Sequence, residues 1–230
     1  MKLAIIGYGK MGHAIEALAP DRGHTVKCVI DQTADWQQCQ EALRHCDVAV
    51  EFSQPDVAVE NIRRCFNLNL PVVCGTTGWH KQLDTIATEC RERGQALLVA
   101  SNFSIGMNIM FELNRRLAAL MATRTDYHVS LSETHHIHKL DAPSGTAITL
   151  AQDINQECHT ERMPLSDIVS IREGEVPGIH EVVYDSEVDT LTLRHSAKSR
   201  QGLALGALVA AEFLYHRKGF YTMRDLLSKS

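Results

Sequence analysis

Residues 3–18 read Leu-Ala-Ile-Ile-Gly-Tyr-Gly-Lys-Met-Gly-His-Ala-Ile-Glu-Ala-Leu, and this stretch decides the fold of the first half of the chain. A short apolar run, typical of a buried strand, leads into Gly-x-Gly-x-x-Gly, and an amphipathic helical pattern follows. In such a turn Gly7 permits the tight bend, Gly9 lets the backbone approach a pyrophosphate, and Gly12 lets the helix pack closely on the strand. The strand before the glycines and the helix after them therefore predict a dinucleotide-binding turn.

The next strand ends on an acid that bears on the choice of cofactor. Residues 25–30 read Thr-Val-Lys-Cys-Val-Ile, and Asp31 follows them, about 20 residues after the glycine loop. A carboxylate at that place can accept both ribose hydroxyls of adenosine and repels a 2′-phosphate. Asp31 therefore favours NADH, although Lys10 in the glycine loop could still meet a phosphate, so NADPH stays possible. By itself, Asp31 could also be a polar residue that closes a strand.

The rest of the first half repeats a rhythm of strand and helix. Strands are expected at 47–52, 71–74 and 96–100, and a helix with four apolar positions is expected at 56–66. This order predicts an α/β domain with a Rossmann-like, doubly wound parallel sheet.

Two loops at strand ends are candidates for ligand binding, because such sheets bind ligands at the carboxyl ends of their strands. Gly75-Thr-Thr-Gly78 follows one strand, and Ser101-Asn-Phe-Ser104 follows the next. From the residues alone, the first could be a plain turn and the second a helix cap with a buried phenylalanine.

The second half contains an unusual run of ionisable residues. Residues 133–147 read Glu-Thr-His-His-Ile-His-Lys-Leu-Asp-Ala-Pro-Ser-Gly-Thr-Ala, with three of the twelve histidines. In an extended segment, alternation places Glu133, His135, Ile137 and Lys139 on one face. Imidazole exchanges protons near neutral pH, and an ammonium can hold an anion or give a proton. The pattern predicts an acid/base pair beside a site for an anion.

A helix is expected to restart after Pro143, with Ser144 or Thr146 as its N-cap. The start of that helix would present free N–H groups to an anion. Zinc ligation by His135, His136 and His138 is disfavoured, because the run has no cysteine and no helical His-x-x-x-His spacing. Three surface histidines on an ordinary strand remain an alternative.

Residues 133–147 resemble the signature of the 4-hydroxy-tetrahydrodipicolinate reductase family, the dihydrodipicolinate reductases of bacterial lysine and diaminopimelate synthesis. That signature is Glu-x-His-His-x-x-Lys-x-Asp-Ala-Pro-Ser-Gly-Thr-Ala, and the chain matches it from Glu133 through Ala147. The resemblance implies that His135 is a proton donor and acceptor and that Lys139 is a proton donor. It also implies that the carboxylates of the substrate are held by His136, Gly145 and Thr146.

The strand-end loops of the first half resemble the same family, in its Gly-Thr-Thr-Gly and Asn-Phe-Ser-x-Gly-x-Asn motifs. Members use these loops around the nicotinamide and its ribose. The glycine loop is one residue shorter than in some members, and the segment from Arg172 to His180 is shorter than in long members. Together, the glycine loop, the acid and these motifs give the following cofactor-binding residues: Gly7, Tyr8, Gly9, Lys10, Met11, Gly12, Asp31, Gly75, Thr76, Thr77, Ala100, Ser101, Asn102 and Phe103.

A second domain is expected between residues 105 and 200. A helix at 107–121 is followed by β-rich alternating runs at 127–133, 168–173, 181–185 and 190–195. Strands with few crossovers indicate an α+β domain with a mixed or antiparallel sheet.

Arg200 could reach the substrate or mark the return of the chain to the first domain, and the return is favoured. An apolar helix follows at 203–214. The predicted division is 1–104 with 201–230 for the dinucleotide, and 105–200 for the substrate and for oligomerisation. The resemblance implies a homotetramer built by the sheet of the second domain.

Composition limits the class of protein. The chain has 230 residues, 44% of them hydrophobic, a net charge of -5 and a pI near 6.2, so no broad basic surface for nucleic acid or an anionic membrane is expected. Seven cysteines without a Cys-x-x-Cys pair indicate reduced thiols, and no apolar run reaches the roughly 20 residues of a membrane span. These features predict a cytoplasmic protein.

The function that the resemblance implies is the reduction of a cyclic dicarboxylate by NAD(P)H, with hinge closure bringing hydride donor and acceptor together. Two alternatives stay open. Another two-domain nicotinamide-dependent dehydrogenase could share the plan, and a noncatalytic dinucleotide sensor would need Gly7–Gly12 but not the pair of His135 and Lys139.

Overall fold

The computed structural model describes residues 1–199 and 201–228, so Arg200 lies outside the described residues. The chain divides into two compact units, Met1–Ser104 with Gln201–Ser230, and Ile105–Arg200. Each unit has its own hydrophobic core.

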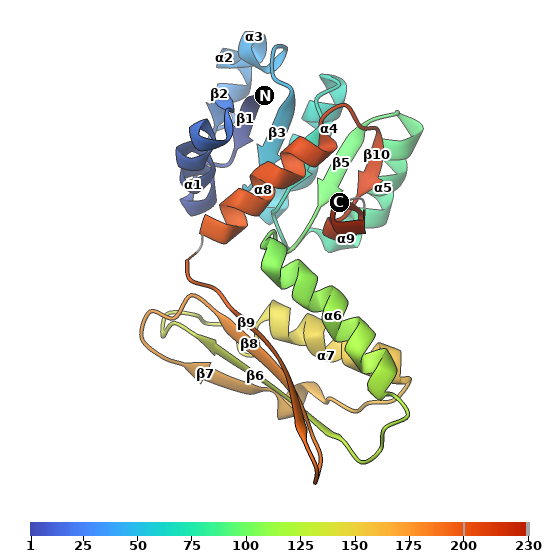
Figure 1. The fold of residues 1–230 in the computed structure, drawn as a ribbon. Coiled ribbons are helices and arrows are strands. Elements are labelled where there is room, and N and C mark those ends of the chain that lie inside the picture. Colours follow the sequence, from blue (N-terminus) through green and yellow to red (C-terminus); the bar gives the residue numbers. More distant parts are fainter. Residues whose placement is uncertain (200, 229–230) are drawn as a thin grey trace. The chain divides into compact units, whose positions relative to one another are not determined.

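The first unit is built on a parallel sheet of six strands in the order β10-β5-β4-β3-β1-β2 (Figure 1). The strands run, in chain order, over β1 (Lys2–Ile6), β2 (Thr25–Ile30), β3 (Val48–Glu51), β4 (Val72–Cys74), β5 (Ala96–Val99) and β10 (Gly219–Tyr221). Residues of β1, β3, β4 and β5 are almost all buried, as continuous apolar strands covered on both faces require. The predicted doubly wound sheet is confirmed.

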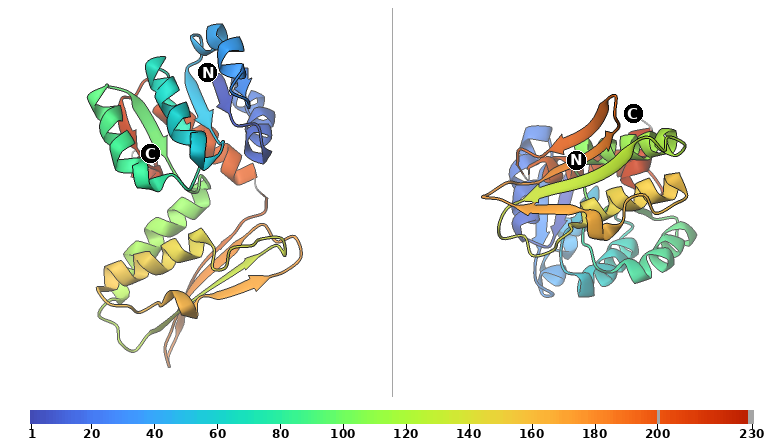
Figure 2. Two further views of the ribbon diagram at one scale, coloured as in Figure 1. Left: turned by 180° about the vertical axis from the view of Figure 1, so that it is seen from behind. Right: turned by 90° about the horizontal axis from the view of Figure 1, so that it is seen from below.

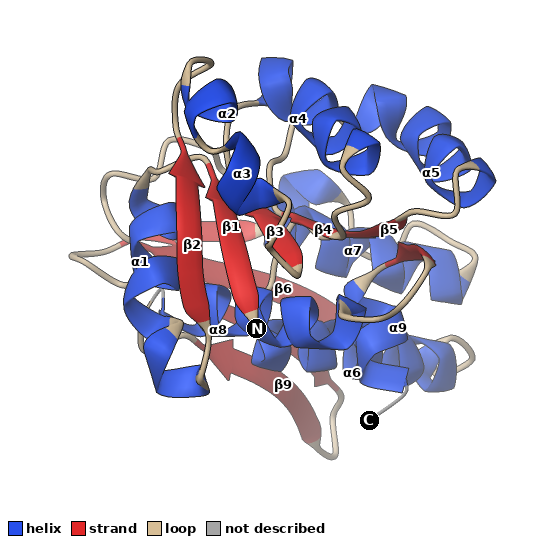
Figure 3. Cartoon of the chain, turned by 90° about the horizontal axis from the view of Figure 1, so that it is seen from above, coloured by secondary structure: helices blue, strands red, loops and turns tan. Residues whose placement is uncertain are grey.

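Helices cover both faces of this sheet. α1 (Lys10–Leu18) and α8 (Gln201–Leu214) lie on one face, and α4 (Pro55–Asn67) and α5 (Leu83–Glu92) lie on the other (Figure 3). Shorter elements complete the unit: α2 (Asp35–Gln38), α3 (Gln40–Leu43), α9 (Met223–Ser228), and the 3-10 turns η1 (Pro20–Arg22) and η2 (His80–Gln82). The periodicity of the sequence did not predict α2, α3 or β10, because segments of three or four residues show no recognisable period.

The second unit is a mixed sheet of four strands in the order β7-β6-β8-β9 (Figure 2). β7 (Val169–Arg172) runs parallel to β6 (His128–His135), whereas β8 (Ile179–Asp185) and β9 (Thr190–Ser196) continue the sheet antiparallel. α6 (Ile105–Met121) and α7 (Gly145–Cys158) pack against each other and against one face of the sheet, and η3 (Leu165–Asp167) precedes β7. The predicted α+β class is confirmed.

Alternation along β6 sets up the site. Val129 and Leu131 point into the core beneath α6 and α7, and the same face continues through Glu133 and His135. Two ionisable side chains therefore lie buried at the carboxyl end of the strand. The opposite face is open in the described part of the chain, where Val169 and Ile171 are 56% and 44% exposed.

All seven cysteines are unpaired. None of the helices in residues 1–199 and 201–228 combines the length and the apolar character that a membrane span needs.

Candidate active site

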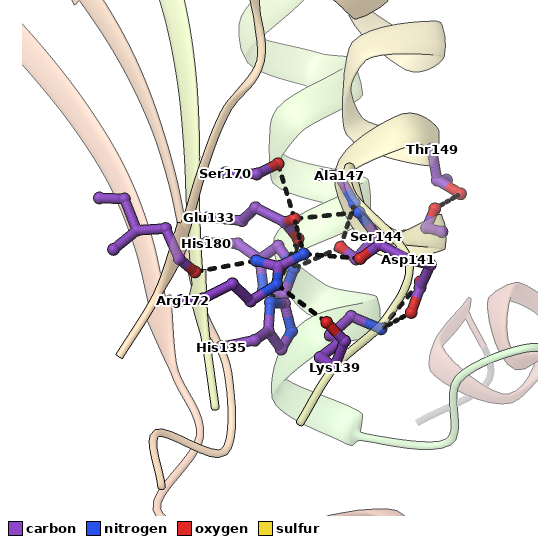
Figure 4. Close-up of polar contacts among 12 residues, drawn as sticks. Glu133, His135, Lys139, Asp141, Ser144, Ala147, Thr149, Ser170, Arg172 and His180 are labelled. Carbon is purple, nitrogen blue, oxygen red and sulfur yellow. Dashed lines mark hydrogen bonds and ion pairs between the residues drawn. The ribbon is translucent and has the colours of Figure 1, made fainter. Parts of the chain in front are cut away.

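A buried carboxylate, Glu133, is the centre of the polar cluster in the second unit (Figure 4). Its Oε1 accepts hydrogen bonds from the amide of Ser144 at 3.0 Å, the hydroxyl of Ser170 at 2.9 Å and the guanidinium of Arg172 at 3.2 Å. Burial opposes ionisation, but the bonds from Ser144 and Ser170 and the contact with Arg172 outweigh it and lower the pKa of Glu133. The cluster therefore contains a fixed negative charge.

Two histidines face the other oxygen of this carboxylate. Nδ1 of His135 lies 3.2 Å from Oε2 of Glu133, and Nε2 of His180 lies 3.8 Å from it. Burial lowers the pKa of His135, and burial together with the neighbouring His135 lowers the pKa of His180 to about 4. Both rings are therefore mainly neutral at neutral pH.

His180, Ser170 and Arg172 were not predicted as site residues. His180 shares the buried face of β8 with Val182 and Tyr184. The signal available in the sequence was therefore a histidine at a position where alternation along the strand predicts a buried apolar residue. Its proximity to Glu133 depends on the pairing of β8 with β6, in which Glu133 lies opposite His180. A single sequence does not give that register.

Lys139 does not continue the face of Glu133 and His135, and this corrects the prediction from alternation. β6 ends at His135, and a turn follows in which the amide of Lys139 donates to the carbonyl of His136 at 3.1 Å. Ile137 is 59% exposed as a result. Nζ of Lys139 contacts both carboxylate oxygens of Asp141, at 2.7 and 2.8 Å, and this contact lowers the pKa of Asp141.

Arg172 nevertheless holds the loop of Lys139 against the cluster. Its guanidinium donates to the carbonyls of Asp141 at 2.6 Å and of Lys139 at 3.3 Å while it also contacts Glu133. One arginine thus joins the loop to the buried carboxylate (Figure 4). His136 lies in the turn of this loop, with its ring 6.1 Å from that of His138.

The start of α7 supplies amide donors beside the cluster. Ser144 is the N-cap, and its hydroxyl accepts from the amide of Ala147 at 3.2 Å, while its own amide donates to Glu133. The amides of Gly145 and Thr146 have no partner within their own helix. Apart from its chain neighbours and the backbone of its own helix, nothing in the described part of the chain lies within 4 Å of the place that a Cβ on Gly145 would take, so this helix start is open to a ligand.

The ligand atoms of Glu133, His135 and His180 lie within 4.8 Å of one another, a spacing that a metal ion could use. The carboxylate already contacts the guanidinium of Arg172, so its charge is balanced by the protein itself. We therefore describe the cluster as an acid/base site.

The first unit has a cavity of about 540 Å³ at the carboxyl ends of β1, β2 and β3. β2 and β3 flank β1 on opposite sides, so this is the topological switch point where such sheets bind nucleotides. Four predicted cofactor residues line it: Gly7, Tyr8, Gly9 and Asp31. The amide of Tyr8 donates to Oδ1 of Asp31 at 3.0 Å, which fixes the acid beside the glycine loop.

A second cavity, of about 420 Å³, adjoins the first and shares Gly9, Phe52 and Ser53 with it. It lies at the start of α1 and beside the loop that follows β4. Six predicted residues line it: Gly9, Lys10, Met11, Gly75, Thr76 and Thr77. The two cavities together give an extended ligand a path past a helix N-terminus, as a dinucleotide requires.

The glycines of the loop match their predicted roles in packing. Gly7 has a φ of +88°, and a Cβ there would lie 2.3 Å from the carbonyl oxygen of Phe52. A Cβ on Gly12 would lie 2.4 Å from the carbonyl oxygen of Gly7, so the helix could not approach the strand as closely with any larger residue. Space around Gly9 is open, as approach of a ligand to the backbone requires.

The segment from Ala100 to Phe103 lines neither of these two cavities. Phe103 is buried against Phe52, with ring centroids 5.5 Å apart, and the side-chain oxygen of Asn102 accepts from the amide of Ser104 at 2.9 Å. These contacts are core packing and capping. Cofactor binding by Ala100, Ser101, Asn102 and Phe103 stays a prediction.

A buried carboxylate in the first unit, Glu51, escaped the sequence analysis. Its Oε2 accepts from the hydroxyl of Thr76 at 2.7 Å and from the thiol of Cys74 at 3.1 Å, and its Oε1 accepts from the hydroxyl of Ser53. The hydroxyl of Thr76 also accepts from the amide of Ser53 at 2.9 Å. Thr76 therefore holds the loop with its side chain, whereas the side chain of Thr77 is exposed.

The first unit has a switch-point cavity beside a glycine loop, and the second has an acid/base cluster beside an open helix start. Together these features define a two-domain oxidoreductase of the dinucleotide-binding class. Two protein-family models match the chain. The family model for the N-terminus of dihydrodipicolinate reductase matches residues 1–103, and the family model for its C-terminus matches residues 106–227. The chain belongs to the dihydrodipicolinate reductase family, so the predicted resemblance is confirmed.

Relatives match the chain over nearly its whole length. The 4-hydroxy-tetrahydrodipicolinate reductase of Christiangramia forsetii is 42% identical over 99% of this chain and 98% of its own. The enzyme of the same name from Thermosipho africanus is 34% identical over 100% of this chain and 99% of its own. Among solved structures, a dipicolinate-bound dihydrodipicolinate reductase from Paenisporosarcina sp. TG-14 has the same fold, with a TM-score of 0.81, 22% identity, and coverage of 96% of this chain and 97% of that chain.

Proposed function

We propose that the protein reduces 4-hydroxy-tetrahydrodipicolinate to tetrahydrodipicolinate with NAD(P)H, in lysine and diaminopimelate biosynthesis. The observation that carries this proposal is the acid/base cluster of His135, Glu133 and Lys139 beside the open amides of α7. A planar dicarboxylate needs two separate anion sites, and this arrangement supplies a cationic loop and a helix start. The solved relative with dipicolinate bound supports a substrate of this class.

In this mechanism the residues of the second unit bind the substrate and supply its proton. The amides of Gly145 and Thr146 hold one carboxylate, and His136 with Lys139 holds the other. When bound at the glycine loop, NAD(P)H supplies the hydride. Loss of water from the 4-hydroxy compound leaves a conjugated imine, and the negative charge left by hydride addition is quenched by a proton from Lys139 or His135.

We propose NADH as the preferred cofactor. Asp31 lines the larger cavity, where its carboxylate suits ribose hydroxyls and repels a 2′-phosphate. Two cations lie within reach of a phosphate: Arg64 lines the same cavity, 5.1 Å from the ring of Trp36, and Lys10 lines the smaller one. NADPH is therefore the second cofactor that this site can accept.

A homotetramer in the cytoplasm is part of the proposal. The face of the second sheet that bears Val169 and Ile171 carries exposed apolar side chains, and such a face is stabilised when another subunit covers it. Seven unpaired cysteines suit a reducing compartment.

The experiment is to measure oxidation of NADH and of NADPH by the purified protein with freshly prepared substrate. Substrate-dependent oxidation, faster with NADH, is the expected result. If both nucleotides bind and neither is consumed, the reductase proposal fails, and a dinucleotide sensor becomes the better account.

A further inference from the structure

The Nδ1 edge of His135 has one acceptor at close range, and that acceptor is a buried carboxylate. Nδ1 lies 3.2 Å from Oε2 of Glu133, both atoms are shielded from solvent, and neither makes a hydrogen bond within the described residues, so the contact between them is electrostatic. Because a carboxylate only accepts hydrogen bonds, the proton of a neutral ring is stabilised on Nδ1 rather than on Nε2.

Glu133 is itself held so that it cannot turn away. Three donors, from Ser144, Ser170 and Arg172, bond its Oε1 and leave Oε2 toward the histidine (Figure 4). These donors come from the start of α7 and from β7, so two neighbouring elements of the second unit fix the carboxylate that β6 carries. An anchor of this kind is needed to hold a catalytic imidazole in one orientation.

The other edge of the ring faces a glycine. Nε2 of His135 faces Gly178, where a Cβ would lie 3.1 Å away. Gly178 has a φ of +155°, at the edge of the range that glycine prefers, and it immediately precedes β8. A glycine at this position leaves room beside the nitrogen atom opposite Glu133.

We propose that Glu133 is a positioning residue that sets the tautomer of His135, so that Nδ1 keeps its proton and Nε2 is the atom that exchanges a proton with the substrate. This inference rests on the proposed reductase function for its catalytic meaning. In its protonated form His135 gives its Nε2 proton to the reduced substrate, which leaves a neutral ring with the proton of Nδ1 toward Glu133. A hydronium ion of the solvent then restores the proton on Nε2 for the next turnover. No redox change occurs at either residue.

The charged and titratable groups around His135 act against one another. Burial lowers its pKa most, Glu133 raises it, and Lys139 and Arg172 lower it further, while Asp141 raises it slightly. On β8, His180 packs edge to face with its ring at 5.1 Å, and His195 of β9 lies on the far side of His180. Loss of the charge on Glu133 therefore removes the largest influence that favours the protonated ring.

The first test is nitrogen NMR of the unaltered enzyme labelled with ¹⁵N-histidine, which distinguishes the two neutral tautomers directly. The expected result is a neutral His135 with Nδ1 protonated and Nε2 bare. A neutral ring protonated on Nε2 would overturn the proposal. This measurement needs no turnover, so it separates failure of this inference from failure of the reductase function.

The second test compares Glu133→Gln with Glu133→Asp and with Glu161→Gln, a control that removes an exposed charge from the same unit. In Glu133→Gln we expect kcat to fall roughly 10- to 100-fold with little change in KM, and the ionisation of His135 in the pH profile of kcat/KM to move to lower pH. Glu133→Asp should recover part of kcat because it keeps the charge. Wild-type kcat and an unmoved pH profile in Glu133→Gln would contradict the proposal.

Discussion

At the scale of single residues, the ion pair of Lys139 bears on the catalytic role that we propose for this residue. Its ammonium is paired with Asp141, whose side chain is 59% exposed. Ion pairs open to solvent contribute about 0–1 kcal/mol, so a carboxylate of the substrate can displace Asp141 at little cost. Until that exchange, the pair holds the ammonium of Lys139 in one position.

Replacement of Lys139 by alanine should therefore affect turnover and leave the nucleotide site intact. We expect kcat/KM for the substrate to fall by roughly 10²- to 10⁴-fold, the range of a general acid, while the Kd for NADH stays about the same. Steady-state kinetics and titration of the quenching of protein fluorescence by NADH measure the two quantities. An equal loss of NADH affinity would contradict the role given to Lys139.

Gly178 gives a second prediction at this scale. In Gly178→Ala the added Cβ would lie 3.1 Å from Nε2 of His135, so the ring must shift and the approach to Nε2 narrows. We expect kcat to fall at least about tenfold, as loss of a positioned proton donor does. Gly174→Ala is the matched control, because Gly174 also has a positive φ but has no atom within 4 Å of its Cβ position. Equal kinetic effects of the two variants would mean that backbone strain, not the ring, is responsible.

At the scale of elements, β6 and β8 each place a histidine in an apolar layer, and burial of these rings makes the stability of the fold depend on pH. The pKa of His180 falls to about 4 on burial, below the 6.5 of an exposed ring. Between these values the unfolded chain binds more protons than the folded one, so stability is complete above about pH 6.5 and is lost as the pH falls. A shift of this size corresponds to roughly 3 kcal/mol, and the lowered pKa of Glu133 acts in the same direction below pH 4.5.

We therefore expect Tm to fall as the pH is lowered from 7 to 4.5, and the fall to be shallower in His180→Gln, which has no imidazole to protonate. Thermal melts followed by circular dichroism at several pH values measure both slopes. The same slope in the variant and in the wild type would show that His180 is not the group that titrates.

Periodicity predicted most of these elements because burial acts on every second or every third to fourth residue. It gave the strands of both units except β10, and it gave α4, α6 and α8 to within a few residues. It placed Lys139 wrongly, because the turn after His135 depends on a backbone bond from Ile137 to Gly174, far along the chain. It also missed Glu51 and His180, whose partners come from other strands through pairings that one sequence does not reveal.

At the scale of the whole molecule, the two cavities and the acid/base cluster belong to different units. The residues that line the cavities lie in Met1–Ser104, and the cluster lies in Ile105–Arg200. Each unit has its own core, so a surface substitution in one should leave binding in the other unchanged. Cofactor preference and substrate affinity are therefore expected to vary independently.

Asp31→Asn tests this separation. The substitution keeps an oxygen that can accept from the amide of Tyr8 but removes the negative charge that repels a 2′-phosphate. We expect the ratio of kcat/KM for NADPH to that for NADH to rise roughly tenfold, about 1.4 kcal/mol, while the Kd for dipicolinate as a substrate analogue does not change. Kinetics with both nucleotides give the ratio, and calorimetric titration of dipicolinate gives its Kd. The control is Asp35→Asn, because the side chain of Asp35 accepts from the amides of Asp31 and Gln32 and its replacement would loosen the same loop. An unchanged nucleotide ratio in Asp31→Asn would shift the determinant of preference to Arg64 or Lys10, the cations lining the two cavities.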